Sequence, residues 1–253
     1  MKPHSILLSL FVVSLSLALG DVLAADEDST SYYLIGNSLT WDTVPSKLDG
    51  DVQWHVDCGK SLPYIFEHPE SPCVKTSTLW TQAFEDKQYD IVSVQPHYGT
   101  TLDEDLAVIS RWLVLQPKAI FVIHTGWARA GTRAEEYAKQ DAAGPMSHSR
   151  AYFEALLGEL RLQYPDRQFR QTHAIDLLAK IADDIAAQKV ASIPLQDVVD
   201  LHRDAIHMKL DSGRYLMHNA MRHALGQPKS LAGFESLDPA MRQYLDSVLE
   251  TLP

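Results

Sequence analysis

The sequence predicts an α/β fold in which helices cover both faces of a parallel sheet. Short apolar runs alternate with amphipathic stretches from Ser31 onward, and no repeat, sustained heptad or Ser/Gly/Pro-rich linker divides the chain. Strands that alternate with helices build a parallel sheet, because the chain returns through a helix after each strand. We therefore expect one domain, a three-layer α/β/α sandwich around a five-stranded parallel sheet.

The expected strands are short runs of mainly aliphatic and aromatic residues, a pattern typical of strands buried in a sheet. The second run differs, because apolar and polar residues alternate along it. The fourth run has the most pronounced strand character, and the fifth has the least. In chain order the expected strands are 32–35, 52–56, 91–94, 119–124 and 169–173.

The expected helices have apolar residues at three- and four-residue spacing. Three consecutive acidic residues, 103–105, suit the positive end of a helix dipole, and Pro165 ends a long helical pattern. The expected helices are 78–84, 106–115, 150–162, 175–188, 213–225 and 239–252. Two loop-rich segments, 190–201 and 226–237, are expected to be insertions near a site.

Residues 1–24 are expected to be a signal peptide that is removed. Lys2 and His4 precede an uncharged apolar run, and small residues lead up to Ala24. The run has about 15 residues, fewer than the roughly 20 that a membrane span needs. Cleavage after Ala24 leaves residues 25–253 as one domain, exported to the periplasm or the medium. An uncleaved N-terminal anchor is the alternative.

The charge and the cysteine count exclude several classes of partner and site. The chain has 253 residues and a formal net charge of -11, which disfavours nucleic acid and anionic membrane surfaces. Its two cysteines are too few for a disulfide scaffold or a cysteine-built zinc site. Export permits a disulfide, and Cys58 and Cys73 flank one loop, so we expect them to be bonded. Composition leaves the oligomeric state open.

Polar and aromatic residues follow the expected strands, where a parallel sheet binds its ligands. The segments in question are 36–40, 57–61, 95–98 and 125–127. Residues in or next to these segments are therefore candidates for lining a substrate pocket, namely Asn37, Trp41, His97, Tyr98 and Trp127.

Ser38 is the first candidate for a chemical role. Gly36 permits a sharp turn after the strand, and the backbone N–H groups at a helix start favour developing negative charge. This setting suits a nucleophile. A serine that only caps the helix is the alternative.

A nucleophilic serine needs a base that a carboxylate orients. Asp204 precedes His207 by three residues, about one helical turn. The carboxylate can therefore reach one imidazole nitrogen while the other nitrogen faces Ser38. In a chain with eleven histidines such a spacing is also typical of an ordinary surface hydrogen bond.

Together these residues resemble the SGNH (GDSL-like) superfamily of serine hydrolases. Residues 33–40 are similar to the first family block, with Ser38 in the nucleophile position and Asn37 where many members carry Asp. Asp204 and His207 match the last block. The resemblance implies a flavodoxin-like strand order 2-1-3-4-5, a Ser38–His207–Asp204 triad, an acyl-serine intermediate and no cofactor.

The resemblance also implies an oxyanion hole. Gly59, within 57–62, matches the glycine of the second block, whose N–H joins that of Ser38 as a donor. Family members normally add an Asn side chain after the third strand, and here Gln95 holds that position with one more methylene. A glutamine that only ends the strand is the alternative.

The expected function is that of an exported serine esterase, with a small-molecule or carbohydrate ester as substrate. Trp41 and Trp127 suggest stacking on a sugar, and an O-acetyl group is the ester we expect. A non-catalytic exported ligand-binding protein on the same fold is the alternative. A metal-dependent hydrolase is disfavoured because His218 and His223, five residues apart, lie on different helix faces; we expect no metal.

Overall fold

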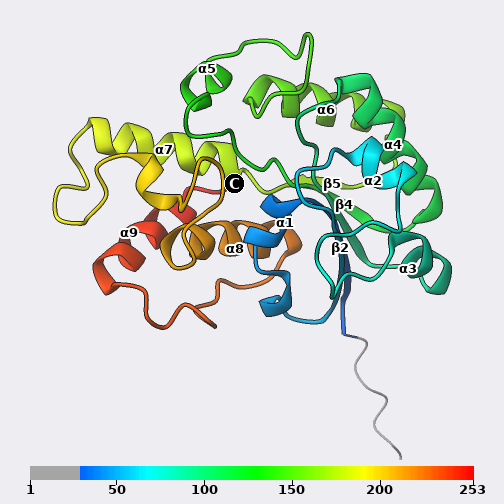
Figure 1. Ribbon diagram of the computed structural model, residues 1–253, viewed down its shortest axis with the longest axis horizontal. Coiled ribbons are helices and arrows are strands. Elements are labelled where there is room, and N and C mark those ends of the chain that lie inside the picture. Colours follow the sequence, from blue (N-terminus) through cyan, green and yellow to red (C-terminus); the bar gives the residue numbers. More distant parts are fainter. Residues whose placement is uncertain (1–28) are drawn as a thin grey trace, which may run out of the picture.

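The computed structural model describes residues 29–253, and the expected signal peptide lies outside that range. A sheet runs through the molecule with helices on both sides (Figure 1). Its strands are β1 (Ser31–Gly36), β2 (Asp51–Val56), β3 (Ile91–Val94), β4 (Ile120–Ile123) and β5 (Phe169–Gln171). The expected strands are all present, within two residues at each end.

All neighbouring strands are parallel, in the order β2-β1-β3-β4-β5. The expected three-layer α/β fold with this strand order is confirmed. In the register of the sheet Gly36 pairs with Val56, and Ile35 pairs with Val94. Since Gly36, Val56 and Val94 end their strands, the turns after β1, β2 and β3 all lie at one edge.

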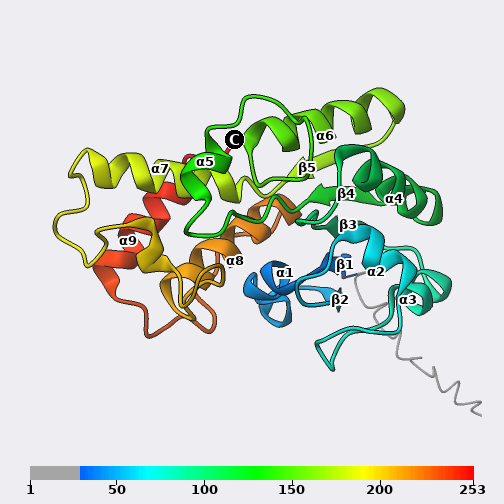
Figure 2. The ribbon, with the colours of Figure 1, turned by 45° about the horizontal axis from the view of Figure 1, so that its top comes forward.

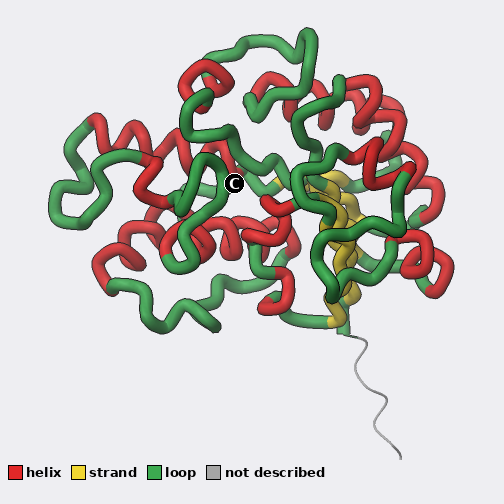
Figure 3. The backbone as a smooth tube through the Cα atoms, in the orientation of Figure 1, coloured by secondary structure: helices red, strands yellow, loops and turns green. Residues whose placement is uncertain are grey.

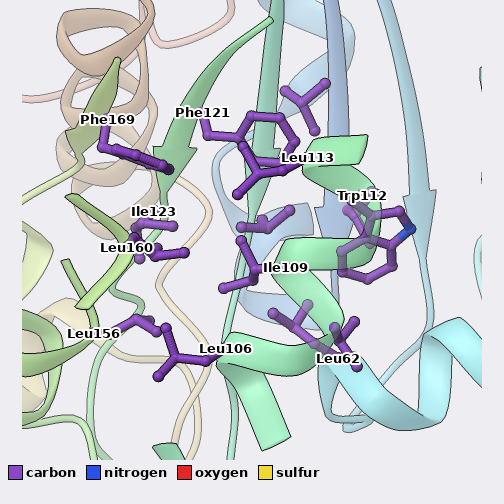
Figure 4. Packing of buried hydrophobic residues seen from close by; sticks show 14 of the residues in the cluster. Leu62, Leu106, Ile109, Trp112, Leu113, Phe121, Ile123, Leu156, Leu160 and Phe169 are labelled. Atoms are coloured by element: carbon purple, nitrogen blue, oxygen red, sulfur yellow. The ribbon is translucent and has the colours of Figure 1, made fainter. Parts of the chain in front are cut away.

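One face of the sheet is covered by α2 (Leu62–Glu67), α3 (Trp80–Asp86), α4 (Leu102–Leu115) and α6 (Arg150–Gln163). Side chains alternate along a strand, so every second residue of β4, such as Phe121 and Ile123, points to this face. Figure 4 shows these two residues against Leu106, Ile109 and Leu113 of α4. The result is one continuous apolar core between sheet and helices.

The other face packs against α8 (Ser212–Leu225), through Met221, Ala224 and Leu225 against Tyr32 and Leu34. Beside α8 lie α1 (Ser38–Asp42), α7 (Ala174–Ala186) and α9 (Pro239–Leu249), which share a second apolar cluster. The short helix α5 (Arg133–Tyr137) lies in the connection between β4 and α6 (Figure 2).

The expected helices are present with shifted ends. Helix α4 begins at Leu102, because Thr101 and Glu104 form a capping box that starts it. The short helices α2 and α5 and the 3-10 turns η1 (Pro45–Lys47) and η2 (Val198–Leu201) were not predicted. Loops fill much of the remaining chain, including most of 190–201 and 226–237 (Figure 3).

The expected disulfide between Cys58 and Cys73 is confirmed, with the two Cα atoms 5.6 Å apart. The Cys73 N–H also donates to the Val56 carbonyl at 3.0 Å. The segment after β2 is therefore tied to the chain that returns toward α3. None of the helices in the described range is long and apolar enough to cross a membrane.

Asp105 on α4 makes the folding stability depend on pH. The side chain is fully buried, its Oδ2 accepts a hydrogen bond from the Tyr152 hydroxyl at 2.7 Å, and its Oδ1 has no partner in the described structure. Burial raises the pKa of Asp105 to about 7, although the Tyr152 hydrogen bond acts in the opposite direction. The unfolded chain has an ordinary Asp pKa of about 4. Between about pH 4 and about pH 7 the folded protein therefore keeps the Asp105 proton that the unfolded chain releases.

We expect this group's contribution to the free energy of unfolding to be greatest below the unfolded pKa and to be lost as pH rises through about 7. The full loss is on the order of 4 kcal/mol, of which roughly 3 kcal/mol falls between about pH 5 and about pH 8. In Asp105→Asn that part of the pH dependence disappears. Urea unfolding of both proteins at about pH 5 and about pH 8 measures it. Equal pH dependence in wild type and variant would contradict the expectation.

Candidate active site

The turn after β1 presents Ser38 at the edge of the sheet. Asn37 caps α1, since its Oδ1 accepts a hydrogen bond from the Leu39 N–H at 3.0 Å. The Asn37 Nδ2 donates to the Lys60 carbonyl at 3.1 Å. One buried side chain thus joins the turn of Ser38 to the loop after β2.

Gln95 supports the same turn from β3. Its Oε1 accepts hydrogen bonds from the Asn37 N–H at 3.1 Å, the Thr40 N–H at 3.3 Å and the Thr40 hydroxyl at 3.2 Å. Its Nε2 donates to the Pro96 carbonyl at 3.1 Å. Two backbone N–H donors fix which end of the amide is oxygen.

This placement corrects the expectation that Gln95 donates to an oxyanion. The side chain is fully buried, so its amide has no surface to offer a substrate. The additional methylene, compared with Asn, lets the amide reach back to the backbone of Asn37 and Thr40. Gln95 therefore stabilises the turn that carries Ser38.

Ser38, His207 and Asp204 come together although 169 positions separate the serine from the histidine. The His207 Nε2 lies 2.9 Å from the Ser38 Oγ, and its Nδ1 lies 2.8 Å from the Asp204 Oδ2. An ionised carboxylate only accepts, so Nδ1 carries the proton and Nε2 accepts from the serine hydroxyl. Geometrically the imidazole can take the Ser38 proton.

Asp204 keeps its charge in this arrangement. Burial acts to raise the pKa of its carboxyl, but hydrogen bonds from the His207 and Ile206 N–H groups and from the His207 ring outweigh it and hold the pKa well below its usual range. The two N–H groups lie 2.8 Å and 2.9 Å from Oδ1. The ionised carboxylate keeps the imidazole in one tautomer.

The loop that carries Asp204 and His207 is closed at its base. The Arg203 N–H donates to the His207 carbonyl at 2.9 Å, and His202 and Met208 form an antiparallel bridge. These backbone contacts join the two ends of the loop.

Trp127 supports this loop from the other side, which corrects its expected place in a substrate pocket. The indole is fully buried, and its Nε1 donates to the Ile206 carbonyl at 2.6 Å. A buried indole N–H needs an acceptor, and this carbonyl provides one. Asn37, another expected pocket residue, is also fully buried and serves as the cap described above.

Two backbone N–H groups, one in the turn after β1 and one in the loop after β2, are available as donors. Within the described residues neither the Ser38 N–H nor the Gly59 N–H donates to a protein acceptor. Gly59 is exposed with a φ of +70°, and a Cβ there would meet nothing within 4 Å. Conformation rather than packing therefore requires glycine at this position.

His97, in the turn after β3, belongs to a mostly buried chain of polar groups. The His148 Nδ1 lies 2.8 Å from the Thr125 carbonyl, so that nitrogen carries a proton, and its Nε2 lies 3.4 Å from the His97 Nδ1. Burial lowers the pKa of His97 to about 3, and the charges of His148, Arg129 and His207 act in the same direction. A neutral His97 that donates through Nδ1 offers Nε2 as an acceptor.

Glu136 of α5 completes this group. Its Oε2 accepts from the His148 N–H at 2.8 Å, and its Oε1 accepts from the Tyr98 hydroxyl at 2.7 Å. Tyr98 is half-buried, with the Arg129 guanidinium 5.7 Å from its ring centre. Trp41, also half-buried, lies 5.9 Å from the ring of Trp54. These two expected pocket residues are thus partly exposed.

Sequence patterns did not single out the buried carboxylates Asp42 and Glu136. Each accepts hydrogen bonds from residues distant in the chain, Asp42 from Met208 and Glu136 from Tyr98. A carboxylate inside an otherwise apolar or short helix is the only signal that could have drawn attention to them. As regards metals, the described residues contain no cluster of three or more His, Cys, Asp or Glu side chains able to hold an ion.

The chain is similar to several solved structures at low sequence identity. A GDSL-like lipase from Parabacteroides merdae is 14% identical over 79% of this chain and 96% of that chain, with a TM-score of 0.46. A member of the lipolytic G-D-S-L family from Veillonella parvula is 10% identical over 79% and 100%, with a TM-score of 0.46. A family two carbohydrate esterase from Cellvibrio japonicus is 14% identical over 56% and 51%, with a TM-score of 0.36.

No protein-family model and no curated protein matches the chain. The identities of the similar structures are too low to transfer an activity, so the function has to be argued from the side chains themselves.

Proposed function

We propose that this protein is an exported serine esterase that hydrolyses carboxylic esters with Ser38 as nucleophile, as the SGNH hydrolases do. One observation carries the proposal: the hydrogen-bonded series Ser38 Oγ, His207 Nε2, His207 Nδ1 and Asp204 Oδ2, with distances of 2.9 Å and 2.8 Å. A serine, a neutral imidazole and an ionised carboxylate in this sequence form the apparatus of acyl transfer.

The reaction follows from the positions of these atoms. Ser38 Oγ forms a bond to the ester carbonyl carbon while its proton passes to the His207 Nε2, and the carbonyl oxygen becomes an oxyanion. The free N–H groups of Ser38 and Gly59 are the proposed donors to that oxyanion. The imidazolium then protonates the leaving alkoxide as the C–O bond breaks, and an acyl-serine remains.

Water completes the cycle. His207 takes a proton from water as the oxygen attacks the acyl-serine, and then returns a proton to Ser38 Oγ as the acid leaves. Asp204 stays ionised throughout and stabilises the imidazolium. The sum is ester plus water to acid plus alcohol, with no cofactor consumed.

A fluorophosphonate probe tests the proposal. We expect its phosphorus to bond to the Ser38 Oγ with loss of fluoride, seen as a mass increase on the Ser38 peptide. Ser38→Ala abolishes labelling, His207→Ala slows it strongly, and Ser46→Ala, an exposed serine on η1, leaves it unchanged. Absence of labelling in a folded wild-type sample would overturn the esterase and favour the non-catalytic binding protein.

An O-acetylated carbohydrate is the proposed substrate class. Trp41 and Tyr98 offer partly exposed rings at the edge of the sheet that presents Ser38, and aromatic faces suit the apolar face of a sugar. His97 offers a hydrogen-bond acceptor to a sugar hydroxyl, because its Nδ1 proton is directed to His148.

We expect a higher kcat/KM for an acetylated sugar than for p-nitrophenyl acetate. In Trp41→Ala the value for the sugar falls by up to about tenfold while the value for the aryl ester stays near wild type. Steady-state kinetics with both esters measure the difference. An acetylated sugar that reacts no faster than the aryl ester would count against a carbohydrate substrate.

A further inference from the structure

Asp42 is a fully buried carboxylate at the last position of α1, the helix that begins with Ser38. A buried charge costs several kcal/mol unless it is well paired. At Asp42 the pairing is extensive: Oδ1 accepts from the Arg203 Nη1 at 3.0 Å and from the Arg214 Nε at 2.9 Å, and Oδ2 accepts from the Met208 N–H at 2.8 Å.

Two of these donors flank the loop of Asp204 and His207. Arg203 directly precedes Asp204, and Met208 directly follows His207. The Arg203 guanidinium also donates to the Met208 carbonyl, so the two ends of the loop are joined to each other as well as to Asp42. Asp42 therefore accepts a hydrogen bond from each end of the loop.

Asp42 also shares a rigid element with the serine. Residues four apart in a helix lie one above the other, about 6 Å along the axis. A short path of covalent and hydrogen-bonded groups then runs from Ser38 through α1 and the Asp42 carboxylate to Met208 and His207. Arg214 of α8 adds a third attachment, so α1, the loop and α8 meet at one carboxylate.

We propose that Asp42 is a positioning residue that sets the separation of the Ser38 hydroxyl and the His207 imidazole by holding both ends of the loop. Its expected effect on rates rests on the proposed esterase function, whereas its effect on the loop does not. A displacement of about 1 Å between reacting groups can cost about a hundredfold in rate.

Asp42→Asn tests this, with Asp184→Asn as a matched control. In Asp42→Asn the side chain keeps its shape, but an amide N–H donor now faces the Met208 N–H or the two arginines, which are donors themselves. Asp184 on α7 is also buried and paired with two cations, Lys180 and Lys189, and makes no hydrogen bond to the loop. Both variants thus lose a buried, paired carboxylate, and only in Asp42→Asn does that carboxylate bind the loop of Asp204 and His207.

In Asp42→Asn we expect kcat for an ester and the rate of fluorophosphonate labelling to fall by about a hundredfold, with KM unchanged. In Asp184→Asn both rates stay near wild type while the melting temperature falls in both variants. Should Asp42→Asn fail to fold, Arg203→Met removes one donor from a partly exposed side chain and is expected to lower both rates by about tenfold.

Proton NMR of His207 supplies a readout that needs no activity. The Nδ1 proton bonded to Asp204 gives a downfield resonance. We expect its chemical shift to be the same in wild type and Asp184→Asn and to change in Asp42→Asn, where the Ser38 hydroxyl no longer lies at bonding distance from Nε2. An active wild type with equal activity and an equal His207 resonance in Asp42→Asn overturns the role of Asp42 alone. A wild type that neither labels nor hydrolyses esters overturns the esterase, and the resonance then decides the role of Asp42 by itself.

Discussion

Asp204→Asn is expected to lower kcat by about three to four orders of magnitude while leaving the fold intact. The Asn Oδ1 can still accept from the Ile206 and His207 N–H groups, so its Nδ2 faces the imidazole. An amide N–H there needs an acceptor, which forces the His207 proton onto Nε2, opposite the Ser38 hydroxyl. The His207 Nε2 then carries a hydrogen and has no lone pair to accept the Ser38 proton. Because about half of the Asp204 side chain is exposed, the substitution costs little stability.

A second Asp–His pair in the chain is the control for this effect. Asp176 lies three positions from His173 and binds its Nδ1 at 3.0 Å, the same type of contact in the reverse order along the chain. No described serine hydroxyl bonds the other nitrogen of that ring. Asp176→Asn is therefore expected to leave ester hydrolysis unchanged. A loss of less than tenfold in Asp204→Asn, measured with the same ester, would show that this carboxylate does not orient the base.

Gly36→Ala is expected to remove most activity and to lower the free energy of unfolding by about 2–3 kcal/mol. A Cβ on Gly36 would lie 2.1 Å from the Thr40 Oγ1 and 2.8 Å from the Gln95 Cβ. Thr40 can rotate only by giving up its bond to Gln95, and the Gln95 Cβ is fixed to the end of β3. The turn that carries Ser38 must therefore move away from β3.

Gly158→Ala provides the matched glycine substitution. Gly158 lies on the exposed side of α6, and a Cβ there meets nothing within 4 Å. Alanine in a helix interior is favoured over glycine, so this variant should gain about 0.5–1 kcal/mol of stability. Urea unfolding and ester hydrolysis of both variants separate the two cases. Wild-type stability and activity in Gly36→Ala would mean that the contact between turn and strand is not tight.

Much of the fold could be predicted because its strands are short apolar runs that end at polar residues or glycine. The helices α2 and α5 escaped prediction because they have only six and five residues, too few for an apolar period to show. Their helical form depends on neighbours: Trp80 of α3, for example, donates to the Ile65 carbonyl of α2 at 3.0 Å.

The site could be predicted less completely, because the role of a polar residue depends on partners that arrive later in the chain. Trp127 follows a strand, as a pocket residue would, but its indole is buried and donates to the Ile206 carbonyl, 79 positions further on. Gln95 occupies a position that suits an oxyanion donor, and its longer side chain reaches the backbone instead. The Asp204–His207 spacing was informative because both residues lie in one local turn.

The position of Ser38 and His207 in the chain has a consequence for when activity can develop. The proposed nucleophile follows the first strand, whereas the proposed base comes after all five strands and seven of the α-helices that the structure describes, 169 positions later. A partly synthesised or partly folded chain carries the serine without its base, and Asp42 without the donors that neutralise it. Under the proposed mechanism Ser38 becomes reactive only after the two ends of the fold have met, and we expect an activity-based probe to report completed folding as directly as it reports chemistry.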